Sequence, residues 1–321
     1  MNVLLAVDDC PESQTAVSLL QSLQLPSDSS LILLQVIEPK QWTEGIEGKS
    51  MIHLRPILSS AKSKEADKAW QFVNKLREPF RNSKLSVTPL VRDGIPGAEI
   101  LSAIEKYRID LVVLGTRGRT GLKRFLLGSV SEWVLTEAPC SVLIVRKKSG
   151  SRPNKSKRLN FLIGTDGSLD ANVAVEYLRQ LKFPRSSHLT VCHILEKQEA
   201  LQTELSAQLG LTGRFDLKKL TGEIRKTREQ RGKELLKTCA GKLSRRGLTI
   251  EKLLMHGDPA DQLLTISQRK KIDLLVVGSR GITGLRRFLL GSVSHKLVRH
   301  APCSVLVVRQ PQDKKRNRMT G

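Results

Sequence analysis

Two glycine-rich stretches carry the residues in this chain whose types and spacing best suit ligand chemistry. The first, Gly115–Ser131, reads GTRGRTGLKRFLLGSVS, and the second, Gly278–Ser294, reads GSRGITGLRRFLLGSVS. Each combines Gly-x-x-Gly with a Gly-Ser pair after nine further residues. Glycines let a backbone turn tightly and approach a ligand, and the amides at a following helix N-terminus attract anions. The chain therefore contains a predicted phosphate-binding loop twice.

The two stretches belong to a longer internal repeat. Residues 110–146 align with residues 273–309 without a gap, and 25 of the 37 aligned pairs are identical. NVLLAVDDCPES near the start of the chain also matches NFLIGTDGSLDA, which begins at Asn160. We therefore predict two copies of one domain, at residues 1–147 and 158–310, with a basic linker at 148–157 and a basic disordered tail at 311–321.

Strands and helices that could position these loops alternate within each copy. Runs such as DLVVLG and SVLIVR are typical of strands buried on both faces, and longer segments with helical spacing separate them. Five strands and four helices predict an α/β fold with a Rossmann-like five-stranded parallel sheet and helices on both faces. In the second copy the strands are expected near 159–165, 188–195, 248–255, 273–278 and 304–309, and a long amphipathic helix is expected over 217–246.

These motifs resemble those of the universal stress protein (UspA-like) family, specifically its ATP-binding branch and its tandem two-domain members. The resemblance covers nearly the whole of both halves. It implies that the glycine-rich loop holds phosphates and ribose, that an Asp after the first strand lies close to the nucleotide, and that the end of the second strand lines the adenine pocket. The implied ligand is ATP, alone or with a divalent cation such as Mg²⁺.

The resemblance maps these binding roles onto matching positions in the two halves. In the first half they fall on Ala6, Asp8, Val36, Gly115, Arg117, Gly118, Gly128, Ser129, Val130 and Ser131. In the second half they fall on Gly164, Asp166, Ile194, Gly278, Arg280, Gly281, Gly291, Ser292, Val293 and Ser294.

The first half departs from the Asp-Gly-Ser that often follows the first strand in this family. The second half keeps it as TDGS, whereas the first reads VDDCP. Asp9 would repel phosphate and Pro11 would stiffen the turn, so we expect the first pocket to be the weaker one. Two interpretations without nucleotide stay open: Asp8 and Asp166 as helix caps, and the glycines as strand-to-helix packing positions.

No residue is nominated as catalytic. Neither copy places a Ser-His-Asp set, a metal-spaced His pair or paired carboxylates beside the loop, so we expect a regulatory protein rather than an enzyme, with slow ATP hydrolysis left open. The five cysteines lack C-x-x-C spacing, which argues against a disulfide framework, and Cys140 and Cys303 are expected to be buried strand residues. GIEGKS, Gly45–Ser50, lacks the first Gly of a P-loop and is expected to be a surface loop.

Charge and hydropathy suggest an alternative function and a location. With 54 Lys and Arg against 31 Asp and Glu, the net charge is +23, which attracts polyanions. The alternative is therefore a scaffold that binds no nucleotide and is recruited to nucleic acid or another anionic surface, without sequence specificity because aromatic residues are scarce. No apolar run approaches the ~20 residues of a membrane span and the start does not resemble a secretory signal, so we expect a cytoplasmic protein.

The duplication also suggests an arrangement of the two copies. The last strand of an open sheet leaves an exposed edge. Universal stress proteins commonly dimerise across that edge, so the resemblance implies an intramolecular pseudo-dimer in which SVLIVR faces SVLVVR. Further homodimerisation of the whole chain stays open.

Overall fold

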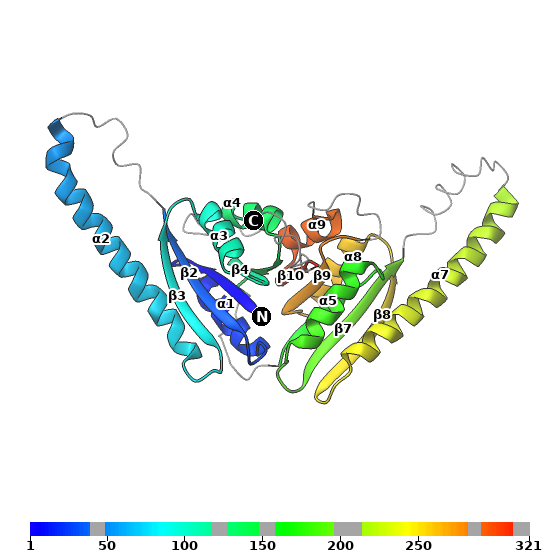
Figure 1. Cartoon of the computed structure of the whole chain (residues 1–321). Helices are drawn as coiled ribbons and strands as arrows, with labels where there is room; N and C mark the ends of the chain where they lie inside the picture. The colour runs from blue at the N-terminus through cyan, green and yellow to red at the C-terminus, as the bar shows by residue number, and fades with distance from the viewer. Residues whose placement is uncertain (39–48, 117–126, 148–157, 196–213, 282–289, 311–321) are drawn as a thin grey trace, which may run out of the picture. The chain divides into compact units, whose positions relative to one another are not determined.

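The computed structural model describes residues 1–38, 49–116, 127–147, 158–195, 214–281 and 290–310, without the side chains of 49–59 and 214–220. These residues form two compact units, of which the first ends at Lys147 and the second at Gln310. Each unit consists of a central sheet with helices on both faces (Figure 1). The segments predicted as linker and tail lie outside the described residues.

The first unit alternates strands and helices along the chain. Its strands are β1 (Asn2–Val7), β2 (Ser30–Ile37), β3 (Ser86–Asp93), β4 (Leu111–Gly115) and β5 (Ser141–Val145). Its helices are α1 (Pro11–Leu23), α2 (Lys49–Arg77), α3 (Pro96–Lys106) and α4 (Ser129–Glu137), and the short 3-10 helix η1 (Glu78–Phe80) follows α2. The strands pair in parallel in the order β3-β2-β1-β4-β5.

The second unit repeats this plan. Its strands are β6 (Asn160–Gly164), β7 (Ser187–Leu195), β8 (Leu248–His256), β9 (Leu274–Gly278) and β10 (Ser304–Val308). Its helices are α5 (Leu169–Gln180), α7 (Arg214–Leu243), α8 (Pro259–Arg269) and α9 (Ser292–His300). The strands again pair in parallel, in the order β8-β7-β6-β9-β10. The predicted fold, two tandem five-stranded parallel sheets with helices on both faces, is confirmed.

The order of the strands creates one switch point in each sheet. The chain moves outward from β6 to β7 and β8, then returns to the other side of β6 as β9, so α8 and α9 pack together while α5 packs over β9 and β10. At a switch point the connections leave in opposite directions and open a crevice beyond the carboxyl ends of the strands. β6 and β9, like β1 and β4, therefore place their following loops side by side.

Burial follows the pattern that the apolar runs predict. The central strands are buried on both faces, as in β1, where Val3, Leu4 and Leu5 have no exposed surface. The outer strands β3 and β8 are half exposed. Long helices cover these outer strands, α2 over β2 and β3 and α7 over β7 and β8. Among the described residues, no helix combines the length and the apolar character that a membrane span requires.

Three local predictions need correction. Residues 45–48 lie outside the described residues, but Lys49 begins α2, so the surface loop predicted for Gly45–Ser50 is wrong at its carboxyl end. Cys140 and Cys303 are buried as predicted, yet they lie in bends just before β5 and β10, because the ladders with β4 and β9 begin at the next residue. The long helix predicted over 217–246 covers the sheet but ends at Leu243, ahead of a turn in which Gly247 has a φ of +83°.

Candidate functional site

The predicted site residues of the second unit gather where β6 and β9 end. Asp166 follows β6 by two residues and fastens the turn there, because its Oδ1 accepts a hydrogen bond of 2.9 Å from the Ser168 amide. Gly167 between them has a φ of +79°, which glycine adopts without strain. The Asp166 Oδ2 faces Gly281, where an added Cβ would lie 2.8 Å from it. The carboxylate of Asp166 therefore occupies the side-chain space of position 281.

The helix that follows the second glycine-rich loop begins without a side-chain cap. Its N-cap is Gly291, whose amide donates to the Ser279 carbonyl at 2.8 Å, and its first residue is the exposed Ser292. A Cβ at Gly291 would lie 3.2 Å from that carbonyl oxygen. The first amides of an uncapped helix lack intrahelical partners, and the helix dipole is positive there, so this end favours an anion.

The first unit repeats this helix start. Gly128 is the N-cap of α4, its amide donates to the Thr116 carbonyl at 2.9 Å, and the exposed Ser129 follows it without a side-chain cap. In contrast, α5 is capped by Ser168 and α8 by Asp258, each through a hydrogen bond to its side chain. Among the described residues, the two helices that follow the glycine-rich loops therefore both lack the side-chain cap that would satisfy their first amides.

The remaining residues of the Gly-Ser-Val-Ser segment have different environments. Ser131 and Ser294 are buried, and their hydroxyls donate to the carbonyls of Gly115 and Gly278, each at 2.7 Å. These hydroxyls pin the first turn of α4 or α9 to the end of the preceding strand. Val130 and Val293 are half-buried within the same turns. Because both hydroxyls already donate to carbonyls, the predicted contact of Ser131 and Ser294 with nucleotide would have to be made by their backbone amides.

Two of the predicted glycines have a packing role. A Cβ at Gly278 would lie 2.7 Å from the backbone of Asp170 at the start of α5, and a Cβ at Gly164 would lie 2.9 Å from the Leu263 side chain of α8. The strand-to-helix packing interpretation therefore applies to these two positions. Gly281 and Gly291 are different. The atoms nearest to an added Cβ there are Asp166 Oδ2 and the Ser279 carbonyl oxygen, which lie beyond the strand ends.

The cap interpretation of Asp8 and Asp166 is wrong. The N-cap of α1 is Cys10, which makes no side-chain cap hydrogen bond, and the N-cap of α5 is Ser168, whose Oγ accepts from the Ala171 amide at 3.2 Å. Asp166 instead organises the turn before the cap. Asp8 is tied to α1 through Ser13, whose hydroxyl accepts from the Asp8 amide at 3.1 Å and lies 2.8 Å from the Asp8 carbonyl oxygen.

A buried acidic residue behind the loop was missed by the sequence reasoning. The Asp170 side chain is 5% exposed, and its Oδ2 accepts from Ser279 Oγ at 2.6 Å and from Arg280 Nε at 3.2 Å. Its Oδ1 accepts from Gln310 Nε2 at 2.9 Å. Arg280, predicted to contact nucleotide, is thus anchored to a carboxylate. The signal in the sequence is weak, because the partners are far apart in the chain and the first half has Glu12 at this position.

The turn after β1 is more acidic than its counterpart after β6. Burial, followed by the nearby carboxylates of Asp8, Glu12 and Asp9, raises the pKa of the Cys10 thiol to about 12. In the second unit, Gly167 stands in place of Asp9, so the turn after β6 has one carboxylate fewer. An anionic ligand would therefore meet less repulsion in the second unit.

The positions predicted for the adenine pocket lie near the carboxyl ends of β2 and β7. Val36 and Ile194 are half-buried and pair with Arg92 and Met255. Gly164 faces Leu263 of α8 and pairs with Cys192, so Ile194, two residues further on, lies on the same face of the sheet. Ala6 and Leu34 pair in the same way, which places Val36 on the corresponding face of the first sheet.

The described geometry suits binding of an anion. Arg117 and Gly118 lie outside the described residues. The described part of the loop ends at Thr116 in the first unit and at Gly281 in the second. Among the residues that the structure describes, no group of three or more His, Cys, Asp or Glu side chains could hold a metal ion. The site offers helix amides, exposed serine hydroxyls and a fixed aspartate.

Comparison with known proteins finds one family in both halves. The model described as "Universal stress protein family" matches residues 1–146 and again residues 158–309. Universal stress protein YxiE of Bacillus subtilis is 34% identical over 148 residues, which cover 46% of this chain and 97% of YxiE. Universal stress protein Rv1996 of Mycobacterium tuberculosis is 28% identical over 210 residues, which cover 64% of this chain and 61% of that protein. The crystal structure of a universal stress protein from Archaeoglobus fulgidus has the same fold, with a TM-score of 0.57 and 20% identity over 98% of this chain and 97% of that one.

Proposed function

Because the chain belongs to the universal stress protein family, we propose that it binds ATP beyond the carboxyl ends of its strands and uses the nucleotide as a regulatory ligand in a stress response. The observation that carries the proposal is the uncapped start of α9, which follows a loop in which Gly281 adjoins the carboxylate of Asp166. The phosphates would accept hydrogen bonds from the first amides of α9 and from the exposed Ser292 hydroxyl. The ribose and base would lie toward Asp166 and Ile194, and a divalent cation such as Mg²⁺ would arrive on the ATP phosphates.

The two units are proposed to bind ATP unequally. The start of α4 offers the same amides as the start of α9, but the turn before α1 carries the Asp9 carboxylate where the second unit has Gly167. We expect calorimetry to resolve a tighter site in the second unit and a weaker site in the first. Two sites of equal ATP affinity would contradict the expected difference between the units, but not the proposal that the chain binds ATP.

Substitutions at Ser292 test the proposal. Ser292→Glu places a carboxylate where the phosphate would bind, and an acidic residue in the first turn also favours the helix dipole. We expect this variant to lose ATP binding at the second site while its thermal stability without ATP is unchanged or higher. Ser292→Ala is the matched control, because it keeps the backbone amides and should weaken binding only slightly.

Calorimetric titration of ATP into the wild type and both variants gives the readout. Loss of ATP binding by the Glu variant alone supports a phosphate site at the start of α9. Equal ATP binding by all three proteins, or no ATP binding by the wild type after removal of any co-purified nucleotide, would overturn it. The Ser129→Glu and Ser129→Ala pair repeats the test in the first unit.

The arrangement of the two units as a pseudo-dimer, with β5 facing β10, is part of the same proposal. Each of these strands is the last in its sheet, and every residue of Ser141–Val145 and Ser304–Val308 is buried. Hydrogen exchange tests it: all amides of both strands should be protected if the edges pair. Rapid exchange at alternate residues would mean that the edges are open, and sedimentation of the whole chain reports any further homodimer.

A further inference from the structure

Basic residues gather at the amino ends of the strands in the second unit, at the opposite end of the sheet from the proposed ATP site. The ladder pairs Ser187 with Leu248, Asn160 with His188 and Phe161 with Leu274, so the starts of β8, β7, β6 and β9 lie side by side. The turns before these strands carry basic residues, which we call the basic edge: Arg158, Lys182, Arg185, Arg245, Arg246, Lys270 and Lys271.

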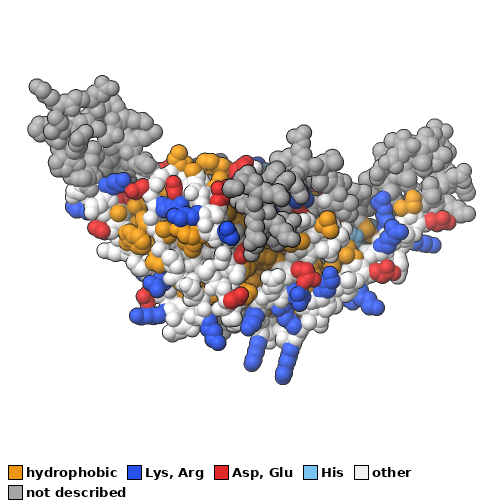
Figure 2. All heavy atoms as spheres, in the orientation of Figure 1, with side chains coloured by type: hydrophobic (Ala, Val, Ile, Leu, Met, Phe, Trp, Pro, Cys, Tyr) orange, Lys and Arg blue, Asp and Glu red, His pale blue; other side chains and the backbone are white. Residues whose placement is uncertain are grey.

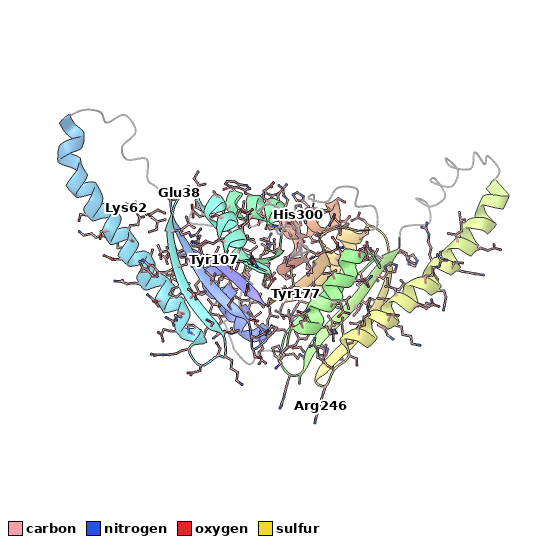
Figure 3. The ribbon with its side chains drawn as sticks, in the orientation of Figure 1. Glu38, Lys62, Tyr107, Tyr177, Arg246 and His300 are labelled. Carbon is pink, nitrogen blue, oxygen red and sulfur yellow. The ribbon has the colours of Figure 1, made fainter. Side chains whose placement is uncertain are left out.

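Most of the basic edge is exposed to solvent. Figure 3 shows Arg246 projecting beyond the end of α7, and Figure 2 shows Lys and Arg side chains at the same lower margin. Arg158, Lys182, Arg185 and Arg246 are all exposed. Arg245 is half-buried: its guanidinium donates to the Leu181 and Leu178 carbonyls at 2.6 and 3.0 Å and lies 4.3 Å from the centre of the Phe183 ring. Arg245 thus fastens the turn that presents its neighbours.

Acidic groups near the basic edge are already engaged. Glu251 is bound by Lys270 at 2.8 Å, and Asp273 accepts from the Asn160 amide at 2.9 Å. Glu176 is bound by Arg179 at 2.7 Å and lies 3.7 Å from Lys242. These pairs neutralise Lys270 on the edge itself, and the exposed side chains of Arg158, Lys182, Arg185 and Arg246 form a positive row beside it.

The duplicated unit shows that the fold does not require this charge. Aligned by their strand starts, the first unit has Gln24 in place of Lys182, Ser27 in place of Arg185 and Ser83 in place of Arg246. Tyr107 likewise replaces Lys270. The two units share the same strand order, and the first unit keeps Arg108 in place of Lys271 and has Arg81 and Lys84 before β3. Its turns nevertheless hold fewer basic residues than those of the second unit. The strand order alone therefore does not require the larger positive charge of the second unit's edge.

We propose that the basic edge binds the phosphate backbone of a nucleic acid without reading its sequence. Neighbouring strands lie about 4.8 Å apart, so the four strand starts form a row about 15 Å long, which suits a linear polyanion. The large apolar side chains that the described residues expose are Trp70, Ile95, Trp133 and Leu169, and none of them lies on this edge to enter a bilayer. The aromatic ring present, Phe183, is covered by Arg245, which leaves phosphate contacts rather than base stacking.

A charge-reversal variant of the full chain tests the basic edge. The edge variant combines Lys182→Glu, Arg185→Glu and Arg246→Glu. The matched control combines Lys226→Glu, Lys233→Glu and Lys237→Glu on the exposed side of α7, which changes the net charge by the same amount. The probe is a fluorescein-labelled single-stranded DNA of mixed sequence, about 20 nucleotides long, and its anisotropy is titrated at several salt concentrations.

We expect the edge variant to weaken binding by at least about tenfold and to reduce the slope of log K against log salt by about 2, since each lost phosphate contact removes about 0.7 for a single strand. The control should keep most of the affinity and the slope. An equal loss in both variants would show diffuse attraction by net charge and overturn the assignment. Unchanged binding in the edge variant would overturn it as well.

Two further measurements distinguish DNA binding at the basic edge from membrane binding and from DNA binding in the proposed ATP site. Vesicles of phosphatidylserine and phosphatidylcholine replace the DNA in one series, and binding of vesicles but not of DNA through the same three residues would identify a membrane surface instead and overturn the proposal. In the other series, saturating ATP or Gly281→Val should leave DNA binding unchanged. Displacement of DNA by ATP would place the DNA in the nucleotide site, so the failure of this inference is distinguishable from that of the proposed function.

Discussion

Asp166 and Gly281 meet beyond the carboxyl ends of β6 and β9, with the carboxylate Oδ2 2.8 Å from the place where a Cβ at position 281 would lie. The contact joins the turn after β6 to the loop after β9, two segments that are remote in sequence. The Ser168 amide holds the other oxygen of the carboxylate, so Asp166 has little freedom to move aside. One wall of the proposed ATP site therefore depends on the absence of a side chain at position 281.

Gly281→Val should abolish ATP binding in the second unit, because the added side chain displaces Asp166 and closes the approach to α9. The thermal unfolding temperature should also fall, because displacing Asp166 breaks its hydrogen bond to the Ser168 amide, but residue 281 is exposed and the unit should stay folded. Calorimetry with ATP and a thermal melt check the two effects. The control is Gly241→Ala on α7, where a Cβ would meet nothing within 4 Å. It should raise stability by up to about 1 kcal/mol without changing ATP binding, and a parallel loss of binding in both variants would contradict the role of Gly281.

Ser294→Ala and Ser292→Ala should differ although the two serines share one motif. Ser294 is buried and donates to the Gly278 carbonyl, so its removal should lower the free energy of unfolding by about 1–2 kcal/mol. Ser292 is exposed, and its replacement should change that free energy by less than about 0.5 kcal/mol. Urea denaturation measures both, and Ser131→Ala should match Ser294→Ala. Equal effects of the two substitutions on α9 would refute the pinning role of Ser294.

Asp170→Ala should be among the more destabilising single changes in the second unit. It leaves Arg280 without its carboxylate and removes the acceptor for Ser279 and Gln310. Because Arg280 is partly exposed and can regain water, we expect a loss of about 2–3 kcal/mol, below the range for a fully buried pair. Denaturation with urea checks the loss, and Glu12→Ala at the matching position should cost less. ATP affinity should also fall, since Arg280 belongs to the loop.

Asp258→Ala should remove a helix cap and part of the acid sensitivity of the second unit. The Asp258 carboxylate accepts from the Asp261 amide at 2.9 Å, and this bond, with the charge of Lys296, lowers its pKa. A lowered pKa gives stability that is present above the unfolded-state pKa of about 4 and lost as the pH falls below it. The substitution should cost about 1 kcal/mol at neutral pH and almost nothing well below pH ~4.

The first unit offers the reverse experiment. Ile95, 61% exposed, stands at the matching N-cap of α3 without a side-chain cap, so Ile95→Asp should stabilise α3 at neutral pH and lose that gain in acid. Urea denaturation at a series of pH values measures both variants. A cost of Asp258→Ala that stays constant with pH would contradict the role of its ionised carboxylate.

Asp9→Asn should make Cys10 more reactive and the first site more receptive to ATP. Burial is the first cause of the raised pKa of Cys10, and the Asp8, Glu12 and Asp9 carboxylates add to it. Removing one carboxylate should lower that pKa, which speeds alkylation by iodoacetamide between pH 8 and about 10, where more thiolate forms. Mass spectrometry measures the alkylation, and Glu137→Gln on the distant end of α4 is the control. An unchanged alkylation rate would mean that the Asp9 carboxylate lies too far from the Cys10 thiol to raise its pKa.

The local patterns in the sequence were enough for the architecture of each unit. Apolar runs separated by helical segments predicted the strands within a few residues, because the buried positions of each segment recur at a regular spacing in the sequence. The repeated Gly-x-x-Gly and Gly-Ser spacing predicted two equivalent loops, and the match of VDDCP against TDGS predicted that their turns differ. Boundaries were less accurate, as at Cys140 and Leu243, because ladder pairing and turns decide where an element ends.

The sequence by itself therefore determined the duplication, the α/β class and the position of both glycine-rich loops. Only the tertiary structure decided what each residue in the motif does. Gly278 packs against α5 whereas Gly281 adjoins Asp166, and Ser294 is buried whereas Ser292 is exposed, although these residues share one motif. The Asp170 carboxylate accepts a hydrogen bond from Gln310, which lies 140 positions further along the chain. A local pattern specifies which face of an element is apolar. The neighbours of a side chain, however, come from distant segments that meet only when the sheet and its helices assemble.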